Sequence, residues 1–289
     1  MCYQVPAFMG EGLTLVVTPL VSLMEDQVLR AREVGLRAEC LTGTQPTPTK
    51  REVVARVRSR ATRLLFVSPE RLELHPFRAL LRDVPVGLVA VDEAHCISEW
   101  GHDFRPSYRR ISAVSRGLRC PTLALTASAT PEVRADILEN LGLRDPLVTV
   151  RSFDRPNLRW AVVRGGGPRG RTRAIYYALR RLPGVAIVYA PTRRSVERTR
   201  DHLAGCGLAV DAYHAGLPGR ERSRVQERFM SGASRVVVAT NAFGMGIDKA
   251  DVRSVLHVQL PTSLEAYYQE AGRAGRDGKP SVCLAFHAR

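Results

Sequence analysis

Short apolar runs rich in Val, Ile and Leu alternate with helical patterns along the chain, and this alternation constrains the fold more than any other feature. Continuous apolar runs are typical of strands that are covered on both faces. Repeated β-α units of this kind favour parallel, doubly wound α/β sheets. The predicted strands are 13–20, 63–69, 86–92, 122–128, 158–163, 185–190, 210–214, 235–240, 255–260 and 282–286.

The same alternation divides the chain into two parts. It is interrupted near 150–157, where Pro156 and polar residues break the rhythm, and then starts again. At roughly 150 residues per domain, a chain of 289 residues is expected to form two domains, which we place at 1–150 and 151–289. The predicted helices are 22–34, 50–60, 77–82, 131–141, 173–182, 195–203, 220–230 and 264–271.

The charge balance favours a polyanion as partner. The 43 basic and 28 acidic residues give a net charge of +15, and each cation placed near a phosphate releases counterions on binding. A competing explanation is a GC-rich coding sequence, because only Lys50, Lys249 and Lys279 are lysine. The charge is therefore weak support for nucleic acid.

Cysteine spacing and hydropathy bear on other classes of site. The six cysteines lie far apart and form no C-x-x-C pair, so isolated free thiols and no zinc site are expected. No apolar run approaches the roughly 18 residues of a membrane span, and no secretory signal is evident. The expected compartment is the cytoplasm, with nucleoid association if the source is bacterial.

Two adjacent carboxylates are the strongest chemical signal. Asp92 and Glu93 follow the apolar run 86–91, in the sequence Asp-Glu-Ala-His that ends at His95. Carboxylates at the carboxyl end of a strand lie at the rim of an α/β sheet, where ligands bind. One can hold Mg²⁺ through water, and the other can orient and deprotonate the attacking water in phosphoryl transfer. The alternative is an ordinary acidic turn after a strand.

Two further segments of the first half have the composition of nucleic-acid contacts or switches. Segment 98–106 interleaves Trp100, His102, Phe104 and Arg105, and bases stack on such aromatic and guanidinium groups. The alternative is that Trp100 and Phe104 are buried packing residues. Segment 126–130 follows another strand and suits a switch between lobes, although a helix cap is the commoner explanation, with Thr130 as the N-cap of the helix that begins at Pro131.

In the second half, glycines and arginines stand out. Segment 240–248 follows a strand and contains Gly244 and Gly246, which let backbone approach a ligand closely. In segment 269–278, Arg273 and Arg276 lie three apart in a helix-like stretch and are expected to point the same way. Such a pair can neutralise charge on a transferring phosphate, as an arginine finger does. A turn without function and a solvated basic face are the alternatives.

In order along the chain, these segments resemble the motifs of superfamily 2 helicases, and specifically of RecQ DNA helicases. Segment 16–27 resembles motif Ia, 68–72 motif Ib, 92–95 motif II and 126–130 motif III. Segment 98–106 is similar to the aromatic-rich loop of RecQ enzymes, and 152–157 to their inter-lobe connection. Segments 213–217, 242–248 and 268–278 resemble motifs of the second lobe, ending in motif VI.

The resemblance implies two tandem RecA-like lobes with mainly parallel sheets, the P-loop NTPase fold, which bind ATP and Mg²⁺. Asp92 would hold Mg²⁺ through water and Glu93 would orient water. The residues that would bind or act on the nucleotide are Asp92, Glu93, Gly246, Asp248, Gln269, Arg273 and Arg276. Those that would contact single-stranded DNA or couple it to hydrolysis are Thr18, Pro19, Ser22, His95, Trp100, His102, Phe104, Arg105 and His214.

The family's Walker A loop, which ends Gly-Lys-Ser, would lie immediately before Cys2, so the first lobe is expected to be incomplete. That loop holds the β- and γ-phosphates, and ATP affinity should collapse without it. Segment 165–172 fits a P-loop spacing with arginine in the lysine position, but we reject it. It follows motif II in the chain, and a planar guanidinium does not replace a compact ammonium.

The sequence thus predicts an ATP-dependent 3′→5′ DNA helicase of RecQ type that acts on single-stranded and forked duplex DNA in repair or recombination. No membrane partner is expected, and the sequence does not indicate the oligomeric state. Two alternatives stay open. One is a non-catalytic DNA-binding remnant of such a helicase, because the P-loop is missing. The other is an RNA helicase of the DEAD/DEAH type, against which segment 98–106 argues.

Overall fold

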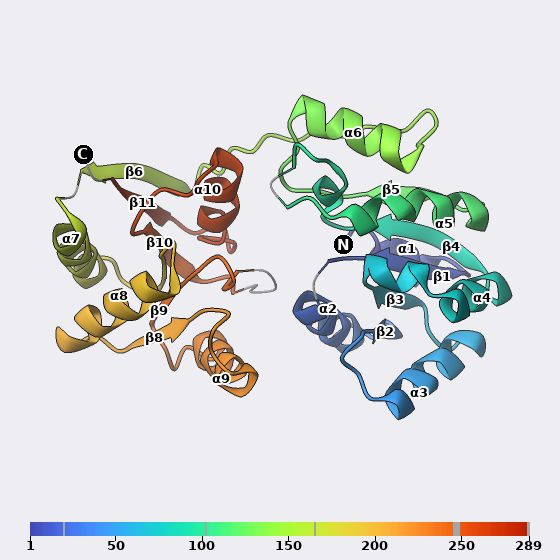
Figure 1. Cartoon of the computed structure of the whole chain (residues 1–289), viewed down its shortest axis with the longest axis horizontal. Helices are drawn as coiled ribbons and strands as arrows, with labels where there is room; N and C mark the ends of the chain where they lie inside the picture. Colours follow the sequence, from blue (N-terminus) through green and yellow to red (C-terminus); the bar gives the residue numbers. More distant parts are fainter. Residues whose placement is uncertain (20, 102, 165, 245–248, 288–289) are drawn as a thin grey trace. The chain divides into compact units, whose positions relative to one another are not determined.

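A computed structural model describes residues 1–19, 21–101, 103–164, 166–244 and 249–287. The chain divides into two compact units, Met1–Thr149 and Val150–Arg289, and each has its own parallel sheet and its own apolar cores (Figure 1). The prediction of two α/β lobes with parallel sheets is confirmed.

The sheet of unit 1 has five parallel strands in the order β2-β3-β1-β4-β5. Because β1 lies between β3 and β4, all five of its residues are buried, as its continuous apolar sequence predicts. The strands are β1 (Leu13–Val17), β2 (Ala38–Leu41), β3 (Leu64–Val67), β4 (Val86–Val91) and β5 (Thr122–Ala124).

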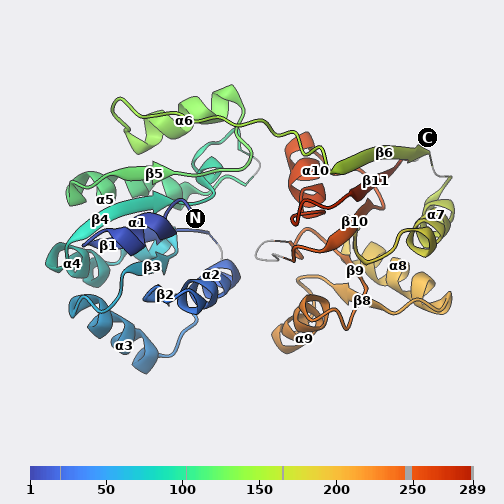
Figure 2. The same ribbon diagram turned by 180° about the vertical axis from the view of Figure 1, so that it is seen from behind.

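Helices cover both faces of this sheet (Figure 2). Side chains of successive strand residues point to opposite faces, so Leu15 and Val17 enter one core and Val16 the other. The α-helices are α1 (Gln4–Met9), α2 (Val21–Glu33), α3 (Thr47–Arg58), α4 (His75–Asp83), α5 (Ile111–Leu118) and α6 (Pro131–Leu141). Short 3-10 helices are η1 (Pro69–Glu73), η2 (Ala94–Ile97) and η3 (Pro106–Arg110).

Unit 2 contains six parallel strands in the order β6-β11-β10-β7-β9-β8. The strands are β6 (Leu158–Arg164), β7 (Val185–Tyr189), β8 (Val210–Tyr213), β9 (Val236–Ala239), β10 (Val252–His257) and β11 (Ser281–His287). The helices are α7 (Pro168–Arg181), α8 (Arg193–Gly205), α9 (Gly219–Met230) and α10 (Leu264–Ala271). Apolar residues of α7 and α8 pack in one core, and those of α9 and α10 in another.

Helix ends follow local chemistry where the sequence offers a cap. The Thr130 hydroxyl accepts from the Val133 N–H at 3.3 Å and Pro131 is the first residue of α6, as predicted. Gly142 ends the helix at a φ of +62°. Among the described residues, no helix has the length and hydropathy required to cross a membrane.

Candidate functional site

The carboxyl edge of the first sheet carries the predicted acidic pair. The Asp92 N–H donates to the Val17 carbonyl at 2.9 Å, which continues the pairing of β4 with β1 by one residue. The Tyr108 hydroxyl, on a fully buried ring, donates to the Asp92 carbonyl at 3.0 Å. Burial raises the pKa of the Asp92 carboxyl above its ordinary value. The backbone N–H and the backbone carbonyl of Asp92 are therefore both held by hydrogen bonds.

Glu93 has a backbone conformation that is uncommon for a residue with a side chain. Its φ of 49° and ψ of 45° lie in the left-handed region, which costs a non-glycine residue about 1–3 kcal/mol. The Glu93 N–H donates to Asp92 Oδ1 at 3.1 Å, and Glu93 Oε2 lies 3.4 Å from His95 Nδ1. Strain of this kind persists where the surroundings hold it, and it is concentrated at functional sites.

Two segments that the sequence analysis treated separately meet at His95. This side chain is 2% exposed, and its Nδ1 lies 3.0 Å from the Thr126 hydroxyl oxygen. The Ala94 N–H donates to the Leu125 carbonyl at 2.8 Å, so the segments that follow β4 and β5 are joined by backbone as well. The predicted residues 92–95 and 126–130 thus form one cluster.

The residues after β1 lie at the same edge of the sheet. Thr18 is 1% exposed, and its hydroxyl has no hydrogen-bond partner within the described part of the chain. The Pro19 carbonyl accepts from Arg105 Nη1 at 3.1 Å, which joins the end of β1 to segment 98–106. The side chain of Ser22 lies outside the described residues.

The two aromatic side chains of segment 98–106 differ in exposure. Trp100 is 79% exposed, so it is not a buried packing residue. Phe104 is half-buried, and the Arg109 guanidinium carbon lies 5.1 Å from the centre of its ring. Arg105 also donates to Asp103 Oδ2 at 3.3 Å. His102 lies outside the described residues.

The acidic residues of this edge fit a magnesium ion that is bound together with a nucleotide. Among the described residues, no three His, Cys, Asp or Glu side chains gather to hold a metal. Mg²⁺ commonly uses only one or two protein carboxylates, and its other ligands are water and substrate phosphates. A single half-buried Asp92 agrees with that ligand set, as does the buried Thr18 hydroxyl at the end of the neighbouring strand β1.

In unit 2, the predicted arginine pair is not on one helix face. Helix α10 ends at Ala271, and Arg273 and Arg276 follow in turns, so the expected helix-like stretch ends before both arginines. Arg273 is 7% exposed and donates through Nη1 to the Gly244 carbonyl, whereas Arg276 is exposed. The reason is that Gly275 adopts a φ of +56°, which a helix does not allow. Gln269 is half-buried in α10.

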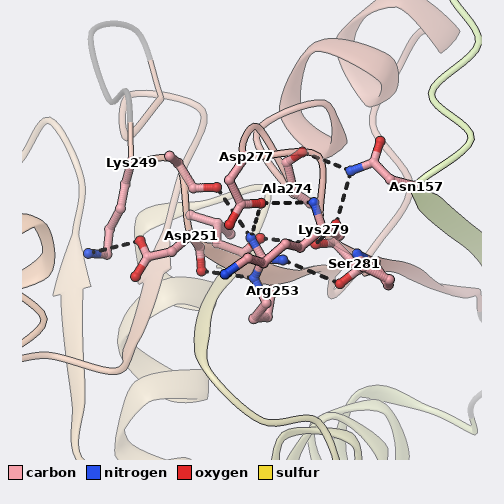
Figure 3. Close-up of polar contacts among 12 residues, drawn as sticks. Asn157, Lys249, Asp251, Arg253, Ala274, Asp277, Lys279 and Ser281 are labelled. Atoms are coloured by element: carbon pink, nitrogen blue, oxygen red, sulfur yellow. Dashed lines mark hydrogen bonds and ion pairs between the residues drawn. The ribbon is translucent and has the colours of Figure 1, made fainter.

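Polar contacts hold the turns that carry both arginines (Figure 3). Asn157 Nδ2 donates to the carbonyls of Gly275 at 2.8 Å and Lys279 at 3.0 Å. Arg253 Nη2 pairs with Asp277 Oδ1 at 2.6 Å. The Arg155 guanidinium also donates to the Gly275 carbonyl, at 2.8 Å, and reaches two further carbonyls, those of Gly272 at 3.3 Å and Ala274 at 3.1 Å.

The sequence analysis missed a buried polar pair beneath these turns. His257 is 1% exposed, and its Nε2 lies 2.8 Å from Glu270 Oε2. The His257 ring stacks on Tyr189, whose hydroxyl donates to the Phe243 carbonyl at 2.7 Å. Burial raises the pKa of Tyr189 to about 12. A histidine inside an apolar strand was the available signal, because a buried imidazole requires a partner.

His214 is held by a second carboxylate. The Gly216 N–H donates to His214 Nδ1 at 3.2 Å, so the Nε2 atom, 2.7 Å from Glu197 Oε1, carries the proton. The His214 hydrogen bond lowers the pKa of Glu197. Gly246 and Asp248 lie outside the described residues, and their nucleotide contacts stay predictions.

A cavity of about 220 Å³ opens at the carboxyl ends of β7 and β10. The Thr192 side chain caps α8 there, and Arg171 Nη1 donates to the Val258 carbonyl at 3.3 Å. The lining contains two guanidinium groups and no carboxylate: Arg171, Thr172, Pro191, Thr192, Ser195, Arg198, Thr199, Val258 and Gln259. A cavity of this composition at a helix N-terminus is suited to an oxyanion.

Two family models match the chain in succession. The model described as DEAD/DEAH box helicase matches residues 1–137, and the helicase conserved C-terminal domain matches 171–278. The yeast S. cerevisiae Dbp5 bound to RNA and ADP BeF3 is 18% identical, with a TM-score of 0.75 over 96% of this chain and 72% of that one. This similarity shows that both units have the RecA-like helicase fold.

Comparisons along nearly the whole of this chain are more specific. The ATP-dependent DNA helicase RecQ of Pasteurella multocida is 43% identical over 99% of this chain and 45% of its own length. The protein of the same name from Bacillus subtilis is 44% identical over 98% of this chain and 48% of its own length. The chain therefore spans a little under half the length of these relatives. Since the identity extends through both lobes, the chain belongs to the RecQ family of helicases.

Proposed function

We propose that the chain is the motor core of an ATP-dependent DNA helicase of RecQ type, with residues 1–150 as its ATP-binding lobe and 151–289 as its C-terminal helicase lobe. The observation that carries the proposal is the acidic cluster. Glu93 is held in a strained backbone conformation beside the half-buried Asp92, and His95 lies next to both Glu93 and the Thr126 hydroxyl. A carboxylate positioned in this way suits phosphoryl transfer, in which catalysis depends on positioning and electrostatics.

In this proposal each residue has a defined task. Asp92 holds the magnesium ion of the nucleotide, which neutralises charge on the phosphates when bound. Glu93 orients the attacking water and accepts its proton. Gln269, Arg273 and Arg276, with Gly246 and Asp248, supply the nucleotide contacts of the second lobe.

The proposed DNA contacts belong to both lobes. Thr18, Pro19, Ser22, His95, His102, Phe104 and Arg105 would couple the strand to hydrolysis, and the exposed Trp100 would stack on a base. In unit 2, His214 and the cavity beside Arg171 and Arg198 would face the phosphate backbone. Translocation with 3′→5′ polarity, unwinding of forked duplexes and a role in DNA repair or recombination, at the nucleoid if the source is bacterial, are part of the proposal.

DNA-stimulated ATP hydrolysis tests the catalytic part. Glu93→Gln removes the proton acceptor and is expected to lower turnover about 10²- to 10⁴-fold, the usual contribution of general base catalysis. Glu52→Gln on α3, where the side chain is 67% exposed, is the matched control and should leave turnover unchanged. Equal turnover in both variants would contradict the assignment of Glu93.

The same experiment separates the second candidate function, a non-catalytic DNA-binding protein. The exposed Trp100 and the basic cavity favour this candidate, because neither needs a nucleotide to bind a strand. Tight binding of single-stranded DNA without turnover that depends on Glu93 would support it. Duplexes with a 3′ or a 5′ single-stranded tail then test polarity, and competition between DNA and RNA strands tests the DEAD/DEAH-type alternative.

A further inference from the structure

The Ser98 hydroxyl bridges two parts of unit 1. Ser98 is the first residue of segment 98–106 and is 0% exposed. Its hydroxyl donates to Asp136 Oδ2 at 2.6 Å and accepts from the Trp100 N–H at 3.2 Å. A hydroxyl that donates to a carboxylate at this distance is in the range of charge-assisted hydrogen bonds. The backbone at Trp100 is therefore connected to Asp136 through one oxygen atom.

The turn that carries Trp100 is closed from its other side as well. The Gly101 N–H donates to the Ser98 carbonyl at 3.0 Å. A Cβ atom at Gly101 would lie 2.3 Å from the His95 carbonyl oxygen, so the backbone of the turn packs directly on η2. The indole of Trp100 is 79% exposed at the outside of this turn.

Asp136 belongs to α6, whose N-cap Thr130 is the last residue of segment 126–130. The Asn140 side chain donates to the Asp136 carbonyl at 2.8 Å. Together with the His95–Thr126 contact, the Ser98–Asp136 hydrogen bond ties the segment after β4 to the segment after β5 and to the helix that follows it. No motif of the sequence analysis marked Asp136.

We infer that Asp136 is a positioning residue, which acts through Ser98 to hold the exposed indole of Trp100 ready for stacking on a base of single-stranded DNA. The inference rests on the proposed DNA-binding function. An exposed aromatic side chain on a fixed backbone loses less conformational freedom when a base stacks on it. Without the hydrogen bond the turn can move, and binding must then order it.

Tryptophan fluorescence tests the inference directly. The chain has two tryptophans, so Trp160→Phe leaves Trp100 as the single reporter. In this background, Asp136→Ala and Ser98→Ala should each lower the fluorescence anisotropy of Trp100 in the free protein. They should also weaken binding of oligothymidylate, read by Trp100 quenching, by about five-fold, the scale of one hydrogen bond. Asp136→Asn retains an acceptor oxygen. It should therefore lose less Trp100 anisotropy and less oligothymidylate affinity than Asp136→Ala.

Glu139→Gln is the matched control, because it neutralises an exposed carboxylate on the same helix. It should change neither readout. Circular dichroism and thermal unfolding establish that each variant is folded. If Asp136→Ala fails to fold, Ser98→Ala decides, because it removes only a hydroxyl group.

Folded variants in which Trp100 anisotropy and oligothymidylate affinity equal those of the Trp160→Phe protein would overturn the positioning role. The proposed function fails in a different way. If oligothymidylate does not quench Trp100 even before Asp136 or Ser98 is changed, the DNA contact is wrong. The anisotropy of the free protein still tests the Ser98–Asp136 hydrogen bond in that case.

Discussion

The Asp92 carboxyl is held in an environment that favours its neutral form. Burial raises its pKa, although the Glu93 N–H opposes the shift. A buried acid whose folded pKa is raised destabilises the fold above that pKa, and the cost disappears below the unfolded value near 3.8. Asp92→Asn keeps the shape and the acceptor atom. It should therefore unfold at a higher temperature at pH 7, by about 2–4 °C for each kcal/mol gained.

Thermal unfolding of both proteins, followed from pH 8 down to the unfolded value near 3.8, checks this expectation. The difference should be largest above the raised pKa of Asp92 and should shrink as the pH falls toward 3.8. An asparagine variant that melts lower than the natural chain at pH 7 would contradict the assigned cause of the shift. If Asp92→Asn is more stable but no longer hydrolyses ATP, the natural aspartate lowers stability for the sake of activity, as is common at functional sites.

Two glycines of unit 1 should respond to alanine in opposite directions. At Gly101 a Cβ would meet the His95 carbonyl oxygen at 2.3 Å, so Gly101→Ala must displace backbone. At Gly117, inside α5, a Cβ meets no atom within 4 Å. Gly117→Ala should stabilise the chain by about 0.5–1 kcal/mol, because glycine is unfavourable within a helix. Gly101→Ala should destabilise it by about 1–3 kcal/mol.

Urea unfolding of the two variants measures both effects. The Gly101 variant should also lose Trp100 quenching by single-stranded DNA, whereas the Gly117 variant should keep it. If Gly101→Ala were as stable as the natural chain and bound DNA normally, the close packing of the turn on η2 would not matter in solution.

Among the strands and helices, the sequence predicted strands with continuous apolar runs well, but it missed a strand that contains a charged residue. Strands β7 and β9 were predicted because their apolar runs are continuous. Strand β2 was missed because Glu39 interrupts its pattern. The structure explains the exception, since Glu39 pairs with Arg32 and Arg56, each at 2.8 Å. Ion pairs between elements distant in sequence are not visible in a local pattern.

The ends of elements show the same limit. The predicted strand 13–20 ends at Val17. The Thr18 N–H still donates to the Val67 carbonyl at 3.0 Å, but Pro19 has no N–H with which to continue the ladder. The predicted acidic site survives this change, since it depends only on where β4 ends. The predicted helix-like stretch through Arg273 and Arg276 does not, because α10 ends at Ala271 and the left-handed Gly275 turns the chain between the two arginines. Glycine adopts positive and negative φ about equally well, so tertiary contacts decide which one occurs and the local sequence does not predict it.

Arg155 determines the shape of the turns after α10. Its guanidinium donates to three backbone carbonyls between Gly272 and Gly275. Arg155→Ala should lower the free energy of unfolding by about 2–4 kcal/mol, because hydrogen bonds to charged groups contribute about 1.5–3 kcal/mol each and this site is only half-buried. Arg159→Ala is the control, since it removes the same charge from an exposed residue on β6, four positions further along the chain.

Hydrogen exchange resolves where Arg155→Ala acts. Peptides covering 268–281 should lose protection, and those of β1 and β4 should keep it. Uniform loss across both units would mean that Arg155 stabilises more than its own turns. Arg159→Ala with an equal effect would attribute the change to charge alone.

On the scale of the whole chain, the restart of the strand and helix rhythm was enough to predict two units, because each unit buries its own apolar runs. The sequence could also predict which strand ends carry polar residues. It could not predict the strand orders, in which β1 pairs with β3 and β4 rather than with β2. Parallel neighbours are chosen by crossovers and helix packing, and these involve residues far apart in sequence.

The net charge of +15 makes DNA binding by the whole chain a matter of counterion release. For single strands, the logarithm of affinity should fall with the logarithm of salt at about −0.7 per phosphate contacted. If Arg171 and Arg198 of the cavity each contact a phosphate, replacing either with alanine should flatten the slope by about 0.7. Arg58→Ala, at an exposed site on α3, has the same charge change and should leave the slope unaltered if DNA does not reach it.

Fluorescence anisotropy of a labelled oligothymidylate, titrated at several salt concentrations, measures these slopes. A contact-specific effect requires the two cavity variants to differ from the Arg58 variant. If all three flatten the slope equally, binding follows total charge and the cavity has no special part in it. If none does, the strand is bound elsewhere, and the high arginine content reflects the coding sequence more than the ligand.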